Sequence, residues 1–336
     1  LAEMPQILWA WTFPAPGAVN DNLATVLGAP DLDGDGWPDA LVACEDYRVR
    51  ALSGHSAGTP AVIWTFGGTD EMPESDRSLA LFTDRDGDGK PEVVYCTGGN
   101  DRSVHLLRGS NGTEIWGYDL RSTGCTALSW IYEAQPVGDL NGDKLPDIAA
   151  ASGSSCNRVI ALNGSDGSLL WQYTGADGFR TVEAAGDMSG DKVPDVLAGS
   201  GTNNLDSRAY LLSGRPSAPA RVIWDRAMGR QVASLATVQD FTGDGVDEAI
   251  AGSWDTTVAA ISGGSRGSVT TSLWSTGMGG GTGSWVSHAI RIPDLDGDCI
   301  DDVAVASWTN STRILSGRTG AVLWSAPVGT GSYAST

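Results

Sequence analysis

A nine-residue acidic motif recurs six times along the 336-residue chain, and its regular spacing constrains the fold more than any other feature. Successive copies begin 53, 55, 48, 53 and 54 residues apart. Such a period indicates one structural unit copied along the chain, because each unit buries its apolar face against the next. The copies are DLDGDGWPD from Asp31, DRDGDGKPE from Asp84, DLNGDKLPD from Asp139, DMSGDKVPD from Asp187, DFTGDGVDE from Asp240 and DLDGDCIDD from Asp294.

A tryptophan near the end of each unit keeps the same period. It closes segments such as ALNGSDGSLLW and ILSGRTGAVLW, which have the pattern of a glycine turn followed by a strand. One further copy, Trp9 in ILWAW, precedes the first complete unit. The periodic tryptophans are Trp64, Trp116, Trp171, Trp224, Trp274 and Trp324.

Each unit contains four short segments with the composition of β-strands, separated by turn residues. In the first unit these segments cover residues 24–27, 39–44, 47–52 and 61–66. Four strands in about 50 residues are typical of a β-propeller blade, whereas linear solenoids have shorter repeats and need capping ends. We therefore predict an all-β fold, a β-propeller of six four-stranded blades, with seven blades as the alternative.

We expect one β-propeller domain over residues 1–336. Residues 5–13 are predicted to form a closing strand, so that N- and C-terminal strands pair and no sheet edge stays exposed. Only 12 residues follow Trp324, too few for the three further strands of a seventh blade. The repeats are predicted at residues 14–66, 67–118, 119–173, 174–226, 227–276 and 277–326.

The acidic motif has the donor pattern of a calcium-binding loop. Side chains at positions 1, 3, 5 and 9 supply oxygen atoms, position 7 can add its backbone carbonyl, and glycines at positions 4 and 6 permit a tight curl. Asp-Gly clusters are also ordinary turns, but turns do not need carboxylates at four fixed positions in six phased copies. We predict up to six Ca²⁺ ions, one per loop, bound by Asp31, Asp33, Asp35, Trp37, Asp39; Asp84, Asp86, Asp88, Lys90, Glu92; Asp139, Asn141, Asp143, Leu145, Asp147; Asp187, Ser189, Asp191, Val193, Asp195; Asp240, Thr242, Asp244, Val246, Glu248; Asp294, Asp296, Asp298, Ile300 and Asp302.

Position 12 of the motif distinguishes these loops from EF-hands. An EF-hand needs a bidentate Glu there, whereas the six residues here are apolar or aromatic: Val42, Tyr95, Ala150, Ala198, Ala251 and Val305. The loops are therefore predicted to connect the first and second strands of each unit. Because loops four and five have Ser189 and Thr242 in place of a position-3 carboxylate, we expect them to bind calcium most weakly.

The repeat resembles the FG-GAP/VCBS repeat of integrin-α-type propellers, which has an acidic loop between its first two strands and small residues after the second. LAGSG before Thr202 and IAGSW at Trp254 carry this second feature. The glycine-to-tryptophan ending is similar to the tryptophan-docking repeat of quinoprotein dehydrogenases, which implies that these tryptophans lock neighbouring blades together. Integrin-like propellers usually have seven blades, and the vicinal cysteines of quinoproteins are absent here, which argues against a quinone cofactor.

The net charge of −20 is largely explained by the loops. Of the 41 acidic residues, 21 occupy motif positions 1, 3, 5 and 9, so the other 20 nearly balance the 21 Lys and Arg. A protein of this charge repels nucleic acid, which we exclude as a partner. No apolar run approaches the ~18 residues of a membrane span, so membrane insertion is not expected.

Four further tryptophans fall on the face opposite the acidic loops, where loop length and content vary most. We predict Trp130, Trp254, Trp285 and Trp308 as a ligand-binding site, with packing between blades or in the central channel as the alternative. No catalytic residue is assigned, since none of the three histidines belongs to a metal-ligand or nucleophile-base pattern.

The function we expect is that of an extracellular calcium-binding recognition or adhesion module for carbohydrate or protein ligands, as a monomer or as part of a larger protein. The alternatives are an extracellular carbohydrate-active enzyme (a lyase or glycosidase) or its accessory domain, and a structural spacer of a surface protein. Of the five cysteines, Cys125 and Cys156 are predicted to form a disulfide. A disulfide and calcium binding both indicate a secreted or cell-surface location.

Overall fold

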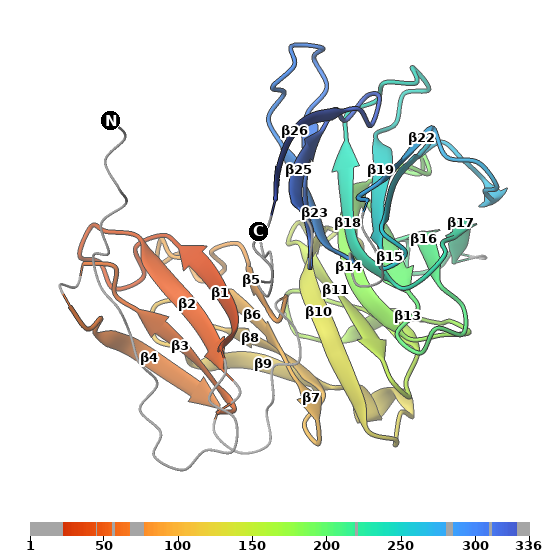
Figure 1. The fold of residues 1–336 in the computed structure, drawn as a ribbon. Helices are drawn as coiled ribbons and strands as arrows, with labels where there is room; N and C mark the ends of the chain where they lie inside the picture. Colours follow the sequence, from red (N-terminus) through yellow and green to blue (C-terminus); the bar gives the residue numbers. More distant parts are fainter. Residues whose placement is uncertain are drawn as a thin grey trace, which may run out of the picture. The chain divides into compact units, whose positions relative to one another are not determined.

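Six mainly antiparallel sheets account for almost all regular structure in the computed structural model, in agreement with the predicted all-β class (Figure 1). The exception within the described residues is one short 3₁₀ helix, η1 (Leu120–Thr123). Among these residues there is no helix with the length and hydrophobicity that crossing a membrane requires. The structure describes residues 23–44, 46–55, 58–67, 77–218, 221–279, 285–308 and 311–327, so the predicted closing strand 5–13 lies outside it.

The chain divides into two compact units, which are described separately. The first comprises Leu1–Gln135 and Asp166–Ser168, and the second comprises Pro136–Ser165 and Leu169–Thr336. The boundary falls within strand β10 (Ser129–Gly138), in the third repeat.

The first unit contains the sheets of the first two repeats, drawn in red and orange in Figure 1. Its two sheets pack face to face around a core that includes Leu32, Trp64 and Tyr95. The start of β10 pairs with the two-residue strand β7 (Gly98–Gly99), with Trp130 opposite Gly98. The strands of the sheets are, in order, β1 (Leu23–Ala29), β2 (Asp39–Cys44), β3 (Arg48–Leu52) and β4 (Val62–Gly67); then β5 (Leu79–Leu81), β6 (Val93–Cys96), β8 (Ser103–Leu107) and β9 (Glu114–Asp119).

The second unit contains strands of the third to sixth repeats. Separate apolar cores fill the spaces between consecutive sheets, one around Trp171 and Phe179, one around Trp224, and one around Val286 and Val303. Its strands are β11 (Asp147–Gly153), β12 (Arg158–Leu162) and β13 (Leu169–Thr174); β14 (Phe179–Gly186), β15 (Asp195–Ser200), β16 (Arg208–Leu212), β17 (Val222–Ala227) and β21 (Gly267–Ser268); β18 (Val232–Val238), β19 (Glu248–Ser253), β20 (Thr257–Ile261) and β22 (Trp274–Gly277); and β23 (Val286–Ile292), β24 (Asp302–Ser307), β25 (Ser311–Leu315) and β26 (Val322–Pro327).

Burial falls from the second to the fourth strand of each sheet. Every residue of β11, β15 and β19 is buried, because these strands are covered on both faces. In the outer strands β4, β9 and β13 only one residue is buried, and in each strand it is the periodic tryptophan. This contrast explains why the second strands are continuous apolar runs while the fourth strands are polar around one tryptophan.

Three periodic tryptophans dock on the turn between the third and fourth strands of the following repeat, whereas Trp324 is 50% exposed. The indole N–H of Trp64 donates to the Gly109 carbonyl at 2.7 Å, and those of Trp171 and Trp274 donate to the Gly214 and Gly317 carbonyls at 2.8 and 2.9 Å. These contacts give Trp64, Trp171 and Trp274 the packing role predicted for the periodic tryptophans. Trp224 is also fully buried, but its indole N–H has no hydrogen-bond partner.

Candidate metal centres

The first aspartate of each acidic loop sets the loop conformation. In the first loop Asp31 Oδ1 accepts a hydrogen bond from the Gly34 N–H at 2.5 Å, and Oδ2 accepts one from the Gly36 N–H at 2.8 Å. The same pair of bonds, to the N–H groups of positions 4 and 6, is present in all six loops. Position 6 has a positive φ even where it is not glycine, at Lys144, Lys192 and Cys299. The loops therefore share one curl despite their different residues.

The carboxylate at position 9 is buried and ties the loop to the turn between the third and fourth strands. Asp39 Oδ2 accepts from the Leu32 N–H at 2.6 Å, and Oδ1 accepts from the Gly54 N–H at 3.0 Å. The turn glycine is obligatory, because a Cβ on Gly54 would lie 1.9 Å from the Pro38 carbonyl oxygen. The equivalent glycines of the other repeats are Gly109, Gly164, Gly214, Gly263 and Gly317.

Burial of the position-9 carboxylates in the second to sixth loops disfavours their charged form. Desolvation raises the pKa of Asp147 and that of Asp195 to about 6, although two backbone N–H groups act on each in the opposite direction. Desolvation likewise raises the pKa of Glu92, Glu248 and Asp302. A bound cation would compensate this unbalanced buried charge.

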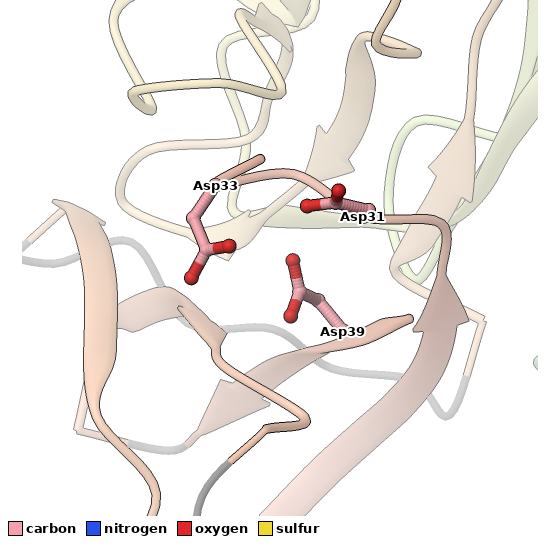
Figure 2. A group of neighbouring side chains, drawn as sticks. All are labelled: Asp31, Asp33 and Asp39. Carbon is pink, nitrogen blue, oxygen red and sulfur yellow. The ribbon is translucent and has the colours of Figure 1, made fainter. Parts of the chain in front are cut away.

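Three loops bring carboxylates from positions 1, 3 and 9 together. One oxygen of each of the three side chains lies within 4.8 Å of the other two. Figure 2 shows the first loop, where Asp39 at the start of β2 points toward the loop that carries Asp31 and Asp33. The three carboxylate triplets are Asp31/Asp33/Asp39, Asp84/Asp86/Glu92 and Asp294/Asp296/Asp302, and they belong to the first, second and sixth loops.

The other three loops have a neutral oxygen donor at position 3, which bonds within its own loop. Asn141 Nδ2 donates to Asp143 at 3.3 Å and to Asp147 at 3.2 Å. Ser189 and Thr242 donate to the first aspartates of their loops at 3.3 and 3.4 Å. These loops therefore keep the same curl with one carboxylate fewer.

The position-5 carboxylates lie outside the triplets, and in the first, fourth and sixth repeats they contact the neighbouring turn. Asp35 Oδ2 is 3.4 Å from His55 Nδ1. In the fourth and sixth repeats the corresponding contacts are Asp191 to Arg215 at 2.9 Å and Asp298 to Arg318 at 3.2 Å. The ligand role of position 5 and that of the position-7 carbonyl stay predictions.

Three of the four candidate recognition tryptophans converge in the second unit. The rings of Trp254 and Trp285 are stacked, with centroids 4.8 Å apart and planes at 12°. Trp308 lies 5.5 Å from Trp285 and 6.1 Å from Trp254, and all three side chains are partly exposed. Trp130 belongs to the first unit and packs on Gly98, where an added Cβ would lie 2.0 Å from its ring.

Two of the five cysteines are oxidised. Both members of the predicted pair, Cys125 and Cys156, are disulfide-bonded. Cys44 and Cys96 are free and buried, and Cys299 is free and exposed within the sixth acidic loop.

No protein-family model and no curated protein matches the chain. Solved structures do resemble it over nearly its full length. BBS1N, crystallised in complex with ARL6DN, matches with a TM-score of 0.61 at 12% identity over 95% of this chain and 86% of BBS1N. The WD40 β-propeller domain of Doa1 matches with a TM-score of 0.56 at 15% identity over 93% of this chain and 84% of that one. BamB from Moraxella catarrhalis gives 0.55 at 15% identity over 92% and 78%.

The fold is a β-propeller. Each of the six predicted repeats supplies one sheet, which is consistent with six blades. At these identities the resemblance concerns the fold alone, so membership of the FG-GAP/VCBS family stays a prediction.

Proposed function

We propose that this chain is a calcium-binding β-propeller of the FG-GAP/VCBS type, secreted or on the cell surface, whose ions stabilise a surface for ligand recognition. The observation that carries the proposal is the triplet geometry. Carboxylates from positions 1, 3 and 9 converge in the three loops that have an acid at all four motif positions. Ordinary Asp-Gly turns have no need of such convergence.

The donor set favours Ca²⁺ over other common metals. The triplets offer oxygen alone, with no histidine or cysteine, which suits a hard cation rather than Zn²⁺. Ca²⁺ accepts six to eight oxygen ligands in a flexible arrangement, whereas Mg²⁺ requires a nearly ideal octahedron. Carboxylates on a loop meet the first requirement more easily than the second. A bound Ca²⁺ would supply positive charge beside the buried position-9 carboxylate, so the loop, the second strand and the following turn would be held together.

Titration calorimetry with CaCl₂ is the test of this proposal. We expect tighter binding at the first, second and sixth loops, because they present the most negative charge, and the weakest at the fourth and fifth. Asp296→Asn should remove one tight site. Asp166→Asn removes an exposed acid outside the motifs and should leave all sites intact. Six equivalent sites would contradict the ranking, and an absence of binding would overturn the proposal.

For recognition we propose the aromatic cluster of Trp254, Trp285 and Trp308 as the contact surface for an extracellular protein or carbohydrate. Partly exposed indole rings offer a large apolar area with a polar edge, and such residues are enriched where proteins bind partners. Among the similar propellers, BBS1N was crystallised with a protein partner, which supports a protein ligand.

Glycan and protein arrays probed with the calcium-loaded chain would separate the two ligand classes. The double substitution Trp254→Ala and Trp308→Ala is expected to lower the affinity for the ligand at least about tenfold. Truncation of an aromatic anchor residue typically costs about 2 kcal/mol or more of binding free energy. Leu205→Ala is the control, because Leu205 is 76% exposed and lies in another loop. Binding that survives the double substitution would exclude the cluster as the contact surface.

A further inference from the structure

Lys90 leaves its own acidic loop and contacts the neighbouring one. It occupies position 7 of the second loop, yet its Nζ donates to the Asp31 backbone carbonyl at 3.1 Å and lies 3.8 Å from Asp31 Oδ1. Its side chain is 19% exposed, so most of it is covered. Position 7 of the other five loops is uncharged: Trp37, Leu145, Val193, Val246 and Ile300.

A second basic side chain contacts a triplet within the second loop. The Arg108 guanidinium forms an ion pair with Asp86, the position-3 acid of that triplet. In the sixth loop, by contrast, the basic contacts among the described residues are Arg318 with Asp298 and Arg291 with Asp301, and neither acid is a triplet member. The three triplets therefore occupy the same motif positions but differ in the basic side chains that contact them.

We propose that Lys90 and Arg108 are built-in cations that weaken calcium binding at the first and second loops, so that the sixth loop is the tightest site. This inference rests on the proposed calcium function. An ammonium or guanidinium group near a triplet carboxylate repels an incoming Ca²⁺ and shares the oxygen that would bind it. Lys90 also links adjacent repeats, because binding at the first loop must displace a side chain that belongs to the second.

Calcium titration calorimetry of Lys90→Met tests the proposal. We expect one site to bind calcium roughly fivefold more tightly than in the unsubstituted chain. This is the size of effect expected when a charge that solvent partly screens is removed. The gain should disappear when Asp33→Asn is added, because that substitution disables the first loop. It should also shrink at high salt. Lys90→Arg keeps the charge and should show no gain, and Arg108→Met should tighten a different site.

The outcomes separate this proposal from the one on which it rests. Calcium binding by the unsubstituted chain with no gain in Lys90→Met overturns the inference and leaves the calcium function standing. A gain that persists with Asp33→Asn also overturns it, because the effect would then lie at another loop. An unsubstituted chain that binds no calcium overturns both. Melting in chelator shows whether each variant is folded, and Lys90→Arg provides the comparison if Lys90→Met is less stable.

Discussion

Chelation of calcium is expected to lower the melting temperature by about 10 °C or more. An ion that binds the folded state alone adds about 2.7 kcal/mol per site when its concentration is 100 times the dissociation constant. Three tight sites would together contribute about 8 kcal/mol by the same relation. At an unfolding entropy of about 2.1 cal/mol/K per residue, 1 kcal/mol shifts the melting temperature of a 336-residue domain by about 1.4 °C.

The measurement compares thermal melts in millimolar CaCl₂, in EDTA, and in EDTA with excess MgCl₂. Magnesium should restore little of the lost stability, because its coordination is stricter. A variant carrying Asp33→Asn, Asp86→Asn and Asp296→Asn is the matched control, since each change acts on a different triplet. Its melting temperature should respond much less to chelation. If the unsubstituted chain melts at the same temperature in CaCl₂ and in EDTA, calcium has no structural role here.

The repeat predicted most of the fold because each unit carries its own complete strand pattern. The expected second strand of the first unit, residues 39–44, coincides with β2, and the expected fourth strand, 61–66, is displaced by one residue from β4. The sequence did not predict the two-residue strands β7 and β21. Such bridges depend on a partner that tertiary structure brings alongside, as β21 pairs in parallel with β17 of the preceding repeat, so they leave no periodic signal.

The candidate sites were predicted unequally. Motif spacing indicated the triplet carboxylates, but it did not reveal that position 9 also binds the N–H of a turn glycine 15 residues later, as Asp39 does with Gly54. The recurring glycine after each third strand was the available signal. For the recognition tryptophans, alignment of the repeats placed Trp254 and Trp308 at the same position of adjacent units, and these two side chains lie close together. The alignment of the repeats could not show that Trp130 packs on Gly98 rather than joining the other tryptophans.

The second large effect is expected from truncation of a docking tryptophan. Trp171→Ala should lower the free energy of unfolding by about 3–5 kcal/mol, because it empties a core site and the cavity closes only in part. Trp171 is 5% exposed and belongs to the core around Phe179, and its ring centroid lies 4.3 Å from the Arg221 guanidinium carbon. Its loss also removes the donor to the Gly214 carbonyl.

Two companion variants separate the contributions of Trp171. Trp171→Phe keeps much of the apolar volume but lacks the indole N–H, so we expect a smaller loss of about 1–2 kcal/mol. Leu169→Ala changes a 38% exposed residue on the same strand and should cost well under half as much as Trp171→Ala. Urea unfolding in saturating calcium provides the comparison, because all ion sites then stay filled. If Trp171→Ala costs no more than Leu169→Ala, the tryptophan is not what locks one repeat to the next.

The turn that receives Trp171 is also held by the position-9 carboxylate Asp195, which accepts a hydrogen bond from the Gly214 N–H. A loosened turn should therefore also weaken calcium binding at the fourth loop. Loss of calcium affinity at that loop alone would therefore connect blade docking to ion binding.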